Sequence, residues 1–238
     1  METERVQYKI GLAEKIVAVE TPYTRSYRMC RDYLTDGEPD IRVSISETDI
    51  QHERDEAEEI QTAGYLETLA VYRKIAEAMV DFDTFLMHGA AVAVDGEAYL
   101  FIAKSGTGKT THIRKWLENL DNAVVVNGDK PLVRADSAGV TVFGTPWCGK
   151  ENMNTNTSAH LKAIIVMERA EENAMCRLTF SEAFPTLLQQ TYRPTDVAKM
   201  KKTLSLLSSL NHRVELFRFD FNNFKDDAFS TAFDALTK

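Results

Sequence analysis

Residues 103–110 read AKSGTGKT, and this stretch governs the interpretation of the whole 238-residue chain. It matches the phosphate-loop pattern G-x-x-x-x-G-K-[ST] at every defined position except the first, where Ala103 replaces glycine. The glycines at 106 and 108 can take backbone conformations closed to other residues, so successive N–H groups can turn inward around an anion. A helix that starts here also directs the positive end of its dipole at the anion. The stretch therefore predicts a nucleoside triphosphate site, with ATP and Mg²⁺ as the expected ligands.

The residues of this loop have separate expected roles. The backbone N–H groups of residues 105–109 would surround the phosphates, Lys109 would reach the β- and γ-oxygens, and Thr110 would offer its hydroxyl to Mg²⁺. The pattern does not distinguish ATP from GTP. The predicted nucleotide-binding residues are Ser105, Gly106, Thr107, Gly108, Lys109, Thr110 and Thr111.

The segments around the loop predict a mixed α/β domain. Two apolar segments, 86–94 and 97–103, flank Asp95-Gly96, a pair that favours the tight turn of a β-hairpin. Residues 111–120 have helical spacing, and the apolar run 123–127 is typical of a buried central strand. Further on we expect strands at 132–134, 140–143, 161–167 and 214–219, helices at 181–190, 195–210 and 225–236, and a long polar loop at 144–158.

The first 80 residues differ from the remainder in their residue pattern. Candidate strands at 8–10, 15–19 and 41–45 precede a charged run at 51–59, which is typical of a solvated linker or helix face. A helix is expected over 63–80, with one packing face made of Tyr65, Leu69, Tyr72, Ala76 and Met79. We therefore expect an α+β cap or partner-recognition region over 1–80 and a nucleotide-binding domain over 81–238.

Composition excludes several classes of protein. The chain has 36 acidic and 28 basic residues, and this net charge of -8 argues against a general nucleic-acid binder. Its three cysteines show no paired spacing, which fits a reducing cytosol better than a disulfide framework. It has no apolar stretch of about 18 residues, so no membrane span is expected. We expect a cytoplasmic protein.

Two motifs beside the loop carry a family resemblance. His88-Gly89 stands in the first half of the predicted hairpin, and NGDK, residues 127–130, directly follows the VVV run. With the loop, this order resembles the HPr kinase/phosphorylase family and its relative, ATP-dependent phosphoenolpyruvate carboxykinase. It looks especially like small HPr-kinase-related proteins, among them kinases that modify peptide precursors. The resemblance covers residues 83–169 well and the remainder loosely. It implies an α/β fold: a mixed central sheet P-loop kinase core with a small N-terminal α+β region.

The resemblance also implies a kinase that transfers the γ-phosphate of ATP to a hydroxyl group. Asp129 would bind Mg²⁺ together with Thr110, accept the proton of the attacking hydroxyl, or do both; the alternative for this residue is a surface turn. His88 would polarise the γ-phosphate or assist proton transfer; its alternative is a histidine packed in the core. With Lys109, these two residues form the predicted catalytic set. His112, on the helix after the loop, has either a packing role or a nucleotide contact.

The polar loop at 144–158 is the expected lid or acceptor-binding segment. Within it, Lys150 would steer phosphate and Trp147 would offer a stacking surface. Two departures from the family stand out. Gly128 occupies a position where the related kinases carry a second aspartate, and their downstream glycine-rich signature is missing.

These features leave several functions open. The acceptor is a serine of a protein or peptide, or a small hydroxylated molecule, and the sequence does not choose between them. A non-catalytic nucleotide-binding regulator is the alternative, and Gly128 is its main support. Phosphoenolpyruvate carboxykinase chemistry ranks last because that family's ligand set is incomplete here. HPr kinases assemble as oligomers, so a homo-oligomer also stays open.

Overall fold

The computed structural model describes residues 5–222 and 224–237. The chain forms two compact units, one ending at Phe82 and the other beginning at Asp83. No helix in these described ranges is both long and apolar enough to cross a membrane.

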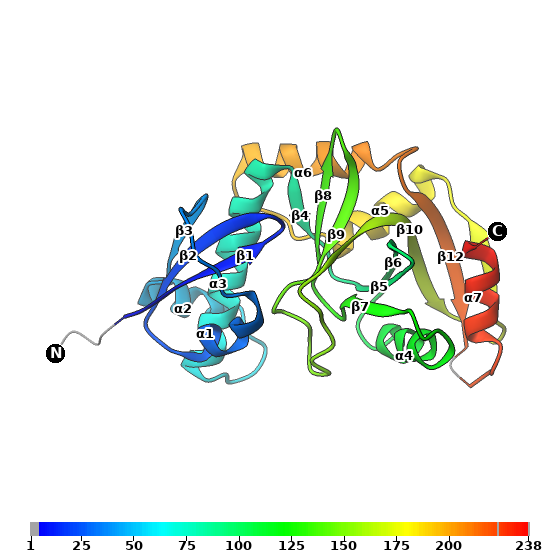
Figure 1. The fold of residues 1–238 in the computed structure, drawn as a ribbon, viewed down its shortest axis with the longest axis horizontal. Helices are drawn as coiled ribbons and strands as arrows, with labels where there is room; N and C mark the ends of the chain where they lie inside the picture. Colours follow the sequence, from blue (N-terminus) through cyan, green and yellow to red (C-terminus); the bar gives the residue numbers. More distant parts are fainter. Residues whose placement is uncertain (1–4, 223, 238) are drawn as a thin grey trace. The chain divides into compact units, whose positions relative to one another are not determined.

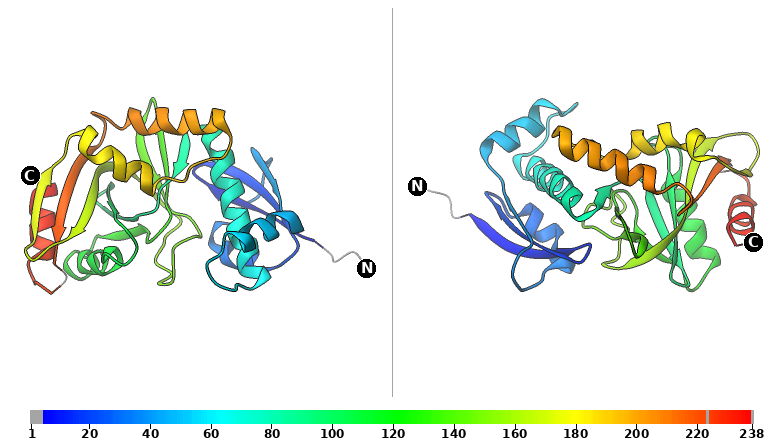
Figure 2. Two further views of the ribbon diagram at one scale, coloured as in Figure 1. Left: turned by 180° about the vertical axis from the view of Figure 1, so that it is seen from behind. Right: turned by 90° about the horizontal axis from the view of Figure 1, so that it is seen from above.

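The first unit is a three-stranded sheet with helices packed on it (Figure 2). Its strands are β1 (Val6–Leu12), β2 (Lys15–Thr21) and β3 (Ile41–Ser44). β2 lies in the centre, antiparallel to β1 and parallel to β3. The three expected strands are thus confirmed with slightly different bounds. The helical segments are α1 (Arg25–Met29), η1 (Arg31–Tyr33), α2 (Glu47–Asp55), α3 (Ala63–Met79) and η2 (Val80–Phe82). Neither α1 nor η1 was expected from the sequence.

The buried face of α3 is rotated from the predicted one. Tyr65, Leu69 and Tyr72 are only partly buried, whereas Leu66 and Ala70 are fully buried. The helix is apolar over more than one stripe, so spacing alone could not select the face that packs. The predicted face was therefore wrong at Tyr65, Leu69 and Tyr72, whereas Ala76 and Met79 are buried as predicted.

The second unit contains one curled mixed sheet (Figure 1). Its spatial order among the described residues is β4-β8-β9-β10-β6-β5-β7, with β12 beside β10 and β11 beside β12. The strands are β4 (Thr84–Leu86), β5 (Ala90–Val94), β6 (Glu97–Ile102), β7 (Val124–Asn127), β8 (Leu132–Asp136), β9 (Gly139–Phe143), β10 (Ser158–Arg169), β11 (Ala174–Arg177) and β12 (Glu215–Phe221). β11 has no counterpart among the expected strands.

The long strand β10 organises this sheet. Along one edge it pairs in parallel with β6. Along the other it pairs antiparallel with β9 over its first residues and then in parallel with β12. Because β6, β10 and β12 run in the same direction, their carboxyl ends meet at one edge of the sheet, where open α/β sheets bind ligands.

Helices cover both faces of the sheet (Figure 1). One apolar cluster holds side chains of α5 (Phe180–Gln190) and α6 (Val197–Ser209). The other holds side chains of α4 (Lys109–Asn119) and α7 (Ala228–Leu236), with Trp116 fully buried at its centre. The structure thus confirms a mixed α/β fold with flanking helices.

Two expectations near the loop need correction. β7 is an edge strand that pairs only with β5 within the described sheet, and Val124 is 42% exposed. Its apolar run suits the edge because residues 153–155 cover its outer side: Gly128 N–H donates to Met153 O (2.7 Å) and Thr155 N–H to Val126 O (3.3 Å). The other correction concerns His88, which lies between β4 and β5 and not within a hairpin strand.

Candidate functional site

The predicted loop at 103–110 connects β6 to α4, and both of its glycines have left-handed backbone conformations. Gly106 and Gly108 have φ of +77° and +118°, a region that other residues rarely adopt. Gly108 is also crowded, because a Cβ there would lie 2.6 Å from Cε1 of Phe221. The position therefore requires glycine for conformation and for space.

Lys109 begins α4 and is largely buried, with 8% of its surface exposed. Its Nζ donates to Ala103 O at 2.9 Å, across the mouth of the loop. Burial lowers the pKa of this ammonium, and the nearby carboxylate of Asp129 acts in the opposite direction. A negatively charged phosphate would favour the charged form in the same way.

Asp129, which follows β7, lies beside His88. His88 Nε2 is 3.1 Å from Asp129 Oδ1, close enough to donate a hydrogen bond, and Gly89 N–H donates to the Asp129 carbonyl at 2.8 Å. Burial alone would raise the pKa of the Asp129 carboxyl. The hydrogen bond from His88 and the charges of Lys130, His88 and Lys109 outweigh burial and hold that pKa below its usual range. Asp129 is therefore an ionised, partly desolvated acceptor.

Asn127 orients this aspartate, and the sequence interpretation did not single it out. It is fully buried at the end of β7, and its Oδ1 accepts from the N–H groups of Asp129 (2.8 Å) and Lys130 (2.7 Å). Its Nδ2 donates to Thr145 O at 2.9 Å. The NGDK turn is thus tied to the start of the long polar loop.

Arg169, at the end of β10, is a second residue that the sequence interpretation missed. Its guanidinium is exposed and donates to the carbonyl of Gly106 inside the phosphate loop. The one signal available in advance was its place directly after the apolar strand at 161–167. Only the pairing of β10 with β6 brings it to the loop.

The polar loop between β9 and β10 lies over Asp129. A Cβ on Gly149 would be 3.2 Å from Asp129 Cβ, and Glu151 pairs with Arg114 of α4. Lys150 is exposed at this loop. Trp147 is only 7% exposed, which leaves little of its ring for stacking against a ligand.

His112 belongs to the core in this structure. It is fully buried and accepts a hydrogen bond from Trp116 Nε1 at 3.0 Å. The rings of Phe101 and Phe219 lie 4.7 and 5.0 Å from its own, between centroids. The packing role is therefore the one that its surroundings support.

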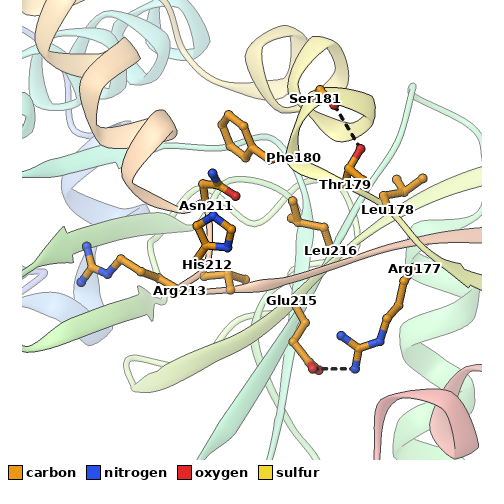
Figure 3. Close-up of a pocket in the computed structure, with 11 residues that line it drawn as sticks. Arg177, Leu178, Thr179, Phe180, Ser181, Asn211, His212, Arg213, Glu215 and Leu216 are labelled. Carbon is orange, nitrogen blue, oxygen red and sulfur yellow. Dashed lines mark hydrogen bonds and ion pairs between the residues drawn. The ribbon is translucent and has the colours of Figure 1, made fainter.

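A cavity of about 700 Å³ lies at the opposite end of β12 from the phosphate loop (Figure 3). The cavity is therefore separate from the candidate site. Its two arginines already have partners within the chain: Arg177 pairs with Glu215, and Arg213 donates to the carbonyls of Asp136 and Gly139.

Comparison with known proteins yields a distant structural similarity. No family model and no curated protein matches the chain. Among solved structures, the Hpr(Ser) kinase/phosphatase from Coxiella burnetii is similar with a TM-score of 0.39 and 7% identity, over 63% of this chain and 89% of that chain. At this level the relationship is one of distant structure only.

Proposed function

We propose that this chain is a Mg²⁺-dependent kinase that transfers the γ-phosphate of ATP to a hydroxyl group. One observation carries the proposal. The ionised carboxylate of Asp129 is hydrogen-bonded to His88 and interacts electrostatically with Lys109 of the loop. Catalysis of phosphoryl transfer depends mainly on positioning the reactants and on stabilising charge, and these groups supply both.

The residues fit a magnesium ion of the kind that nucleotides bring. Mg²⁺ in such sites is held by one or two carboxylates together with the phosphates, and it keeps several waters. Asp129 offers the carboxylate, and Thr110, partly buried in the first turn of α4, offers a hydroxyl. When bound, the ion would neutralise charge on the phosphates.

The roles of the chain's own residues follow from their positions. Loop N–H groups and Lys109 hold the phosphates. Asp129 takes the proton of the acceptor hydroxyl as its oxygen forms a bond to the γ-phosphorus, and the bond from that phosphorus to the β-phosphate oxygen breaks. ADP departs with the electrons of that bond. His88 holds Asp129 in place.

A nucleotide-binding regulator without turnover is the second candidate. It is favoured by Gly128, where a Cβ would lie 3.1 Å from Met153 O and 3.3 Å from Cys148 O. A second aspartate therefore has no room here unless the polar loop moves. Such a chain would bind ATP and transfer nothing.

Transfer of label from γ-labelled ATP, with Mg²⁺ and a desalted lysate of the source, tests the proposal. Asp129→Asn should slow transfer by about 10²- to 10⁴-fold while ATP still binds, and Lys109→Ala should lose ATP binding. Asp121→Asn, in the exposed turn after α4, is the matched control. Binding without labelling of any protein or small molecule would establish the regulator instead.

A further inference from the structure

Phe224 is an aromatic side chain that the proposed reaction leaves unused. It is 95% exposed and lies between the end of β12 and the start of α7. Single exposed apolar residues are common on protein surfaces, so exposure alone says little. It follows Phe221, whose ring lies against Gly108 of the loop, by three residues, and this place in the chain makes it informative.

Two contacts place the end of β12 against that loop. The ring of Phe221, the last residue of β12, lies against Gly108. Arg169, which is the partner of Phe221 in the β10–β12 register, donates to Gly106 O. Residues that follow Phe221 therefore leave the sheet at the rim of the phosphate loop.

Hydrogen bonds hold the backbone N–H groups of Asn222 and Phe224. Asn222 N–H donates to Asn173 Oδ1 (2.7 Å), and Asn222 Nδ2 donates to Glu171 O (2.7 Å). Phe224 N–H donates to Asn222 Oδ1 (2.9 Å), and Asn173 Nδ2 donates to Asp227 Oδ1 (2.6 Å). The amide groups of both asparagines are thus engaged within the chain, while the ring of Phe224 faces solvent.

We propose that the carboxyl ends of β10 and β12 form the nucleoside subsite, with the nucleotide base stacked on the ring of Phe224. The inference rests on the proposed function, because the base arrives on a nucleotide whose phosphates the loop holds. Arg169 adds positive charge between the loop and this subsite. Aromatic stacking recognises the flat face that every base has.

Selectivity follows from the same contacts. The two asparagines, whose amides could otherwise read the edge of a base, already bond to the chain. The subsite therefore holds adenine and guanine by the same stacking contact, and ATP and GTP bind with affinities within about tenfold of each other.

Calorimetric titration with Mg²⁺ and either ATP, GTP or inorganic tripolyphosphate tests the subsite. The wild type should bind ATP more tightly than tripolyphosphate. Phe224→Ala should weaken ATP and GTP by about 5- to 100-fold, the range expected when base stacking is lost, and leave tripolyphosphate unchanged. Phe224→Trp should restore ATP affinity. Ile60→Ala, at a fully exposed apolar residue of the first unit, is the matched control.

The two proposals fail in different ways. Wild-type protein that binds no tripolyphosphate, or binds it equally after Lys109→Ala, would refute the phosphate site itself. Tripolyphosphate binding through Lys109, with ATP affinity unchanged by Phe224→Ala, would overturn the subsite alone. An ATP affinity far from that of GTP would show that a residue reads the edge of the base, and would overturn the stacking account of selectivity.

Discussion

His112 makes the stability of the second unit sensitive to acid. Its ring is fully buried among aromatic side chains, and its Nδ1 has no partner within the described residues. Burial, with a smaller effect of Lys115, lowers the pKa of His112 to about 3. An unfolded histidine has a pKa of about 6.5. Below pH 6.5 the unfolded chain therefore binds a proton that the folded chain does not, and stability falls as the pH falls.

The size of this loss can be worked out for pH 5.0. Because pH 5.0 lies well above the folded pKa, the loss depends almost entirely on the unfolded value. It amounts to about 2 kcal/mol relative to pH 7.5. Removing the imidazole by His112→Leu should abolish this pH-dependent part. At pH 7.5 the variant should be less stable than the wild type by about 1–3 kcal/mol, because the buried N–H of Trp116 loses its acceptor. This difference should shrink by about 2 kcal/mol at pH 5.0, because only the wild type is destabilised by acid through His112.

Urea unfolding followed by tryptophan fluorescence measures the effect in the right part of the chain. The only two tryptophans, Trp116 and Trp147, both lie in the second unit. The free energy of unfolding would be measured at pH 7.5 and 5.0 for wild type and His112→Leu. Other titrating groups are shared by both proteins and cancel in the comparison. An equal loss of stability in both proteins between these pH values would refute the neutral, buried state of His112.

Three further substitutions test the loop and its supports. Gly108→Ala should lower the free energy of unfolding by about 1–3 kcal/mol because the residue has a positive φ. It should also weaken nucleotide binding at least tenfold by calorimetry, and unchanged binding would contradict the proposed role of the loop. Asn127→Ala strips the acceptor from two backbone N–H groups, so urea unfolding should show a loss of about 2–4 kcal/mol, and a loss below 0.5 kcal/mol would contradict the network. Arg114→Ala breaks an exposed ion pair with Glu151 and should lower the free energy of unfolding by less than about 0.5 kcal/mol. If that pair holds the polar loop in place, the variant should nevertheless show faster alkylation of Cys148, as mapped by mass spectrometry.

Local signals account for the parts of the structure that the sequence predicted well. Asp95-Gly96 specifies its turn through its own conformation, with φ of +53° and +84°, and the hairpin of β5 and β6 forms around it as expected. The glycines of the phosphate loop and the start of α4 follow from the same kind of rule. Each of these features depends on residues within one or two turns of the chain.

Non-local pairing explains what the sequence could not predict. Whether residues 124–127 form a central or an edge strand depends on the strand order, and no residue in that run encodes this order. Arg169 is 63 positions from Gly106 and meets it only because β10 joins β6. Asn127 looks like an ordinary turn residue until Thr145 and the backbone of residues 129–130 are brought around it.

The absence of a side chain at Gly128 bears on both proposed functions, the kinase and the nucleotide-binding regulator. Without a side chain at 128, the polar loop approaches until Met153 O would be 3.1 Å from a Cβ there, and the same loop brings Gly149 against Asp129. Burial by itself raises the pKa of Asp129, while the hydrogen bond from His88 and the charges of Lys130, His88 and Lys109 hold that pKa below its usual range. A second aspartate and a close loop thus exclude each other at this site. A phosphate-transfer assay therefore separates the two proposed functions, catalysis with Asp129 as the base and nucleotide binding without turnover.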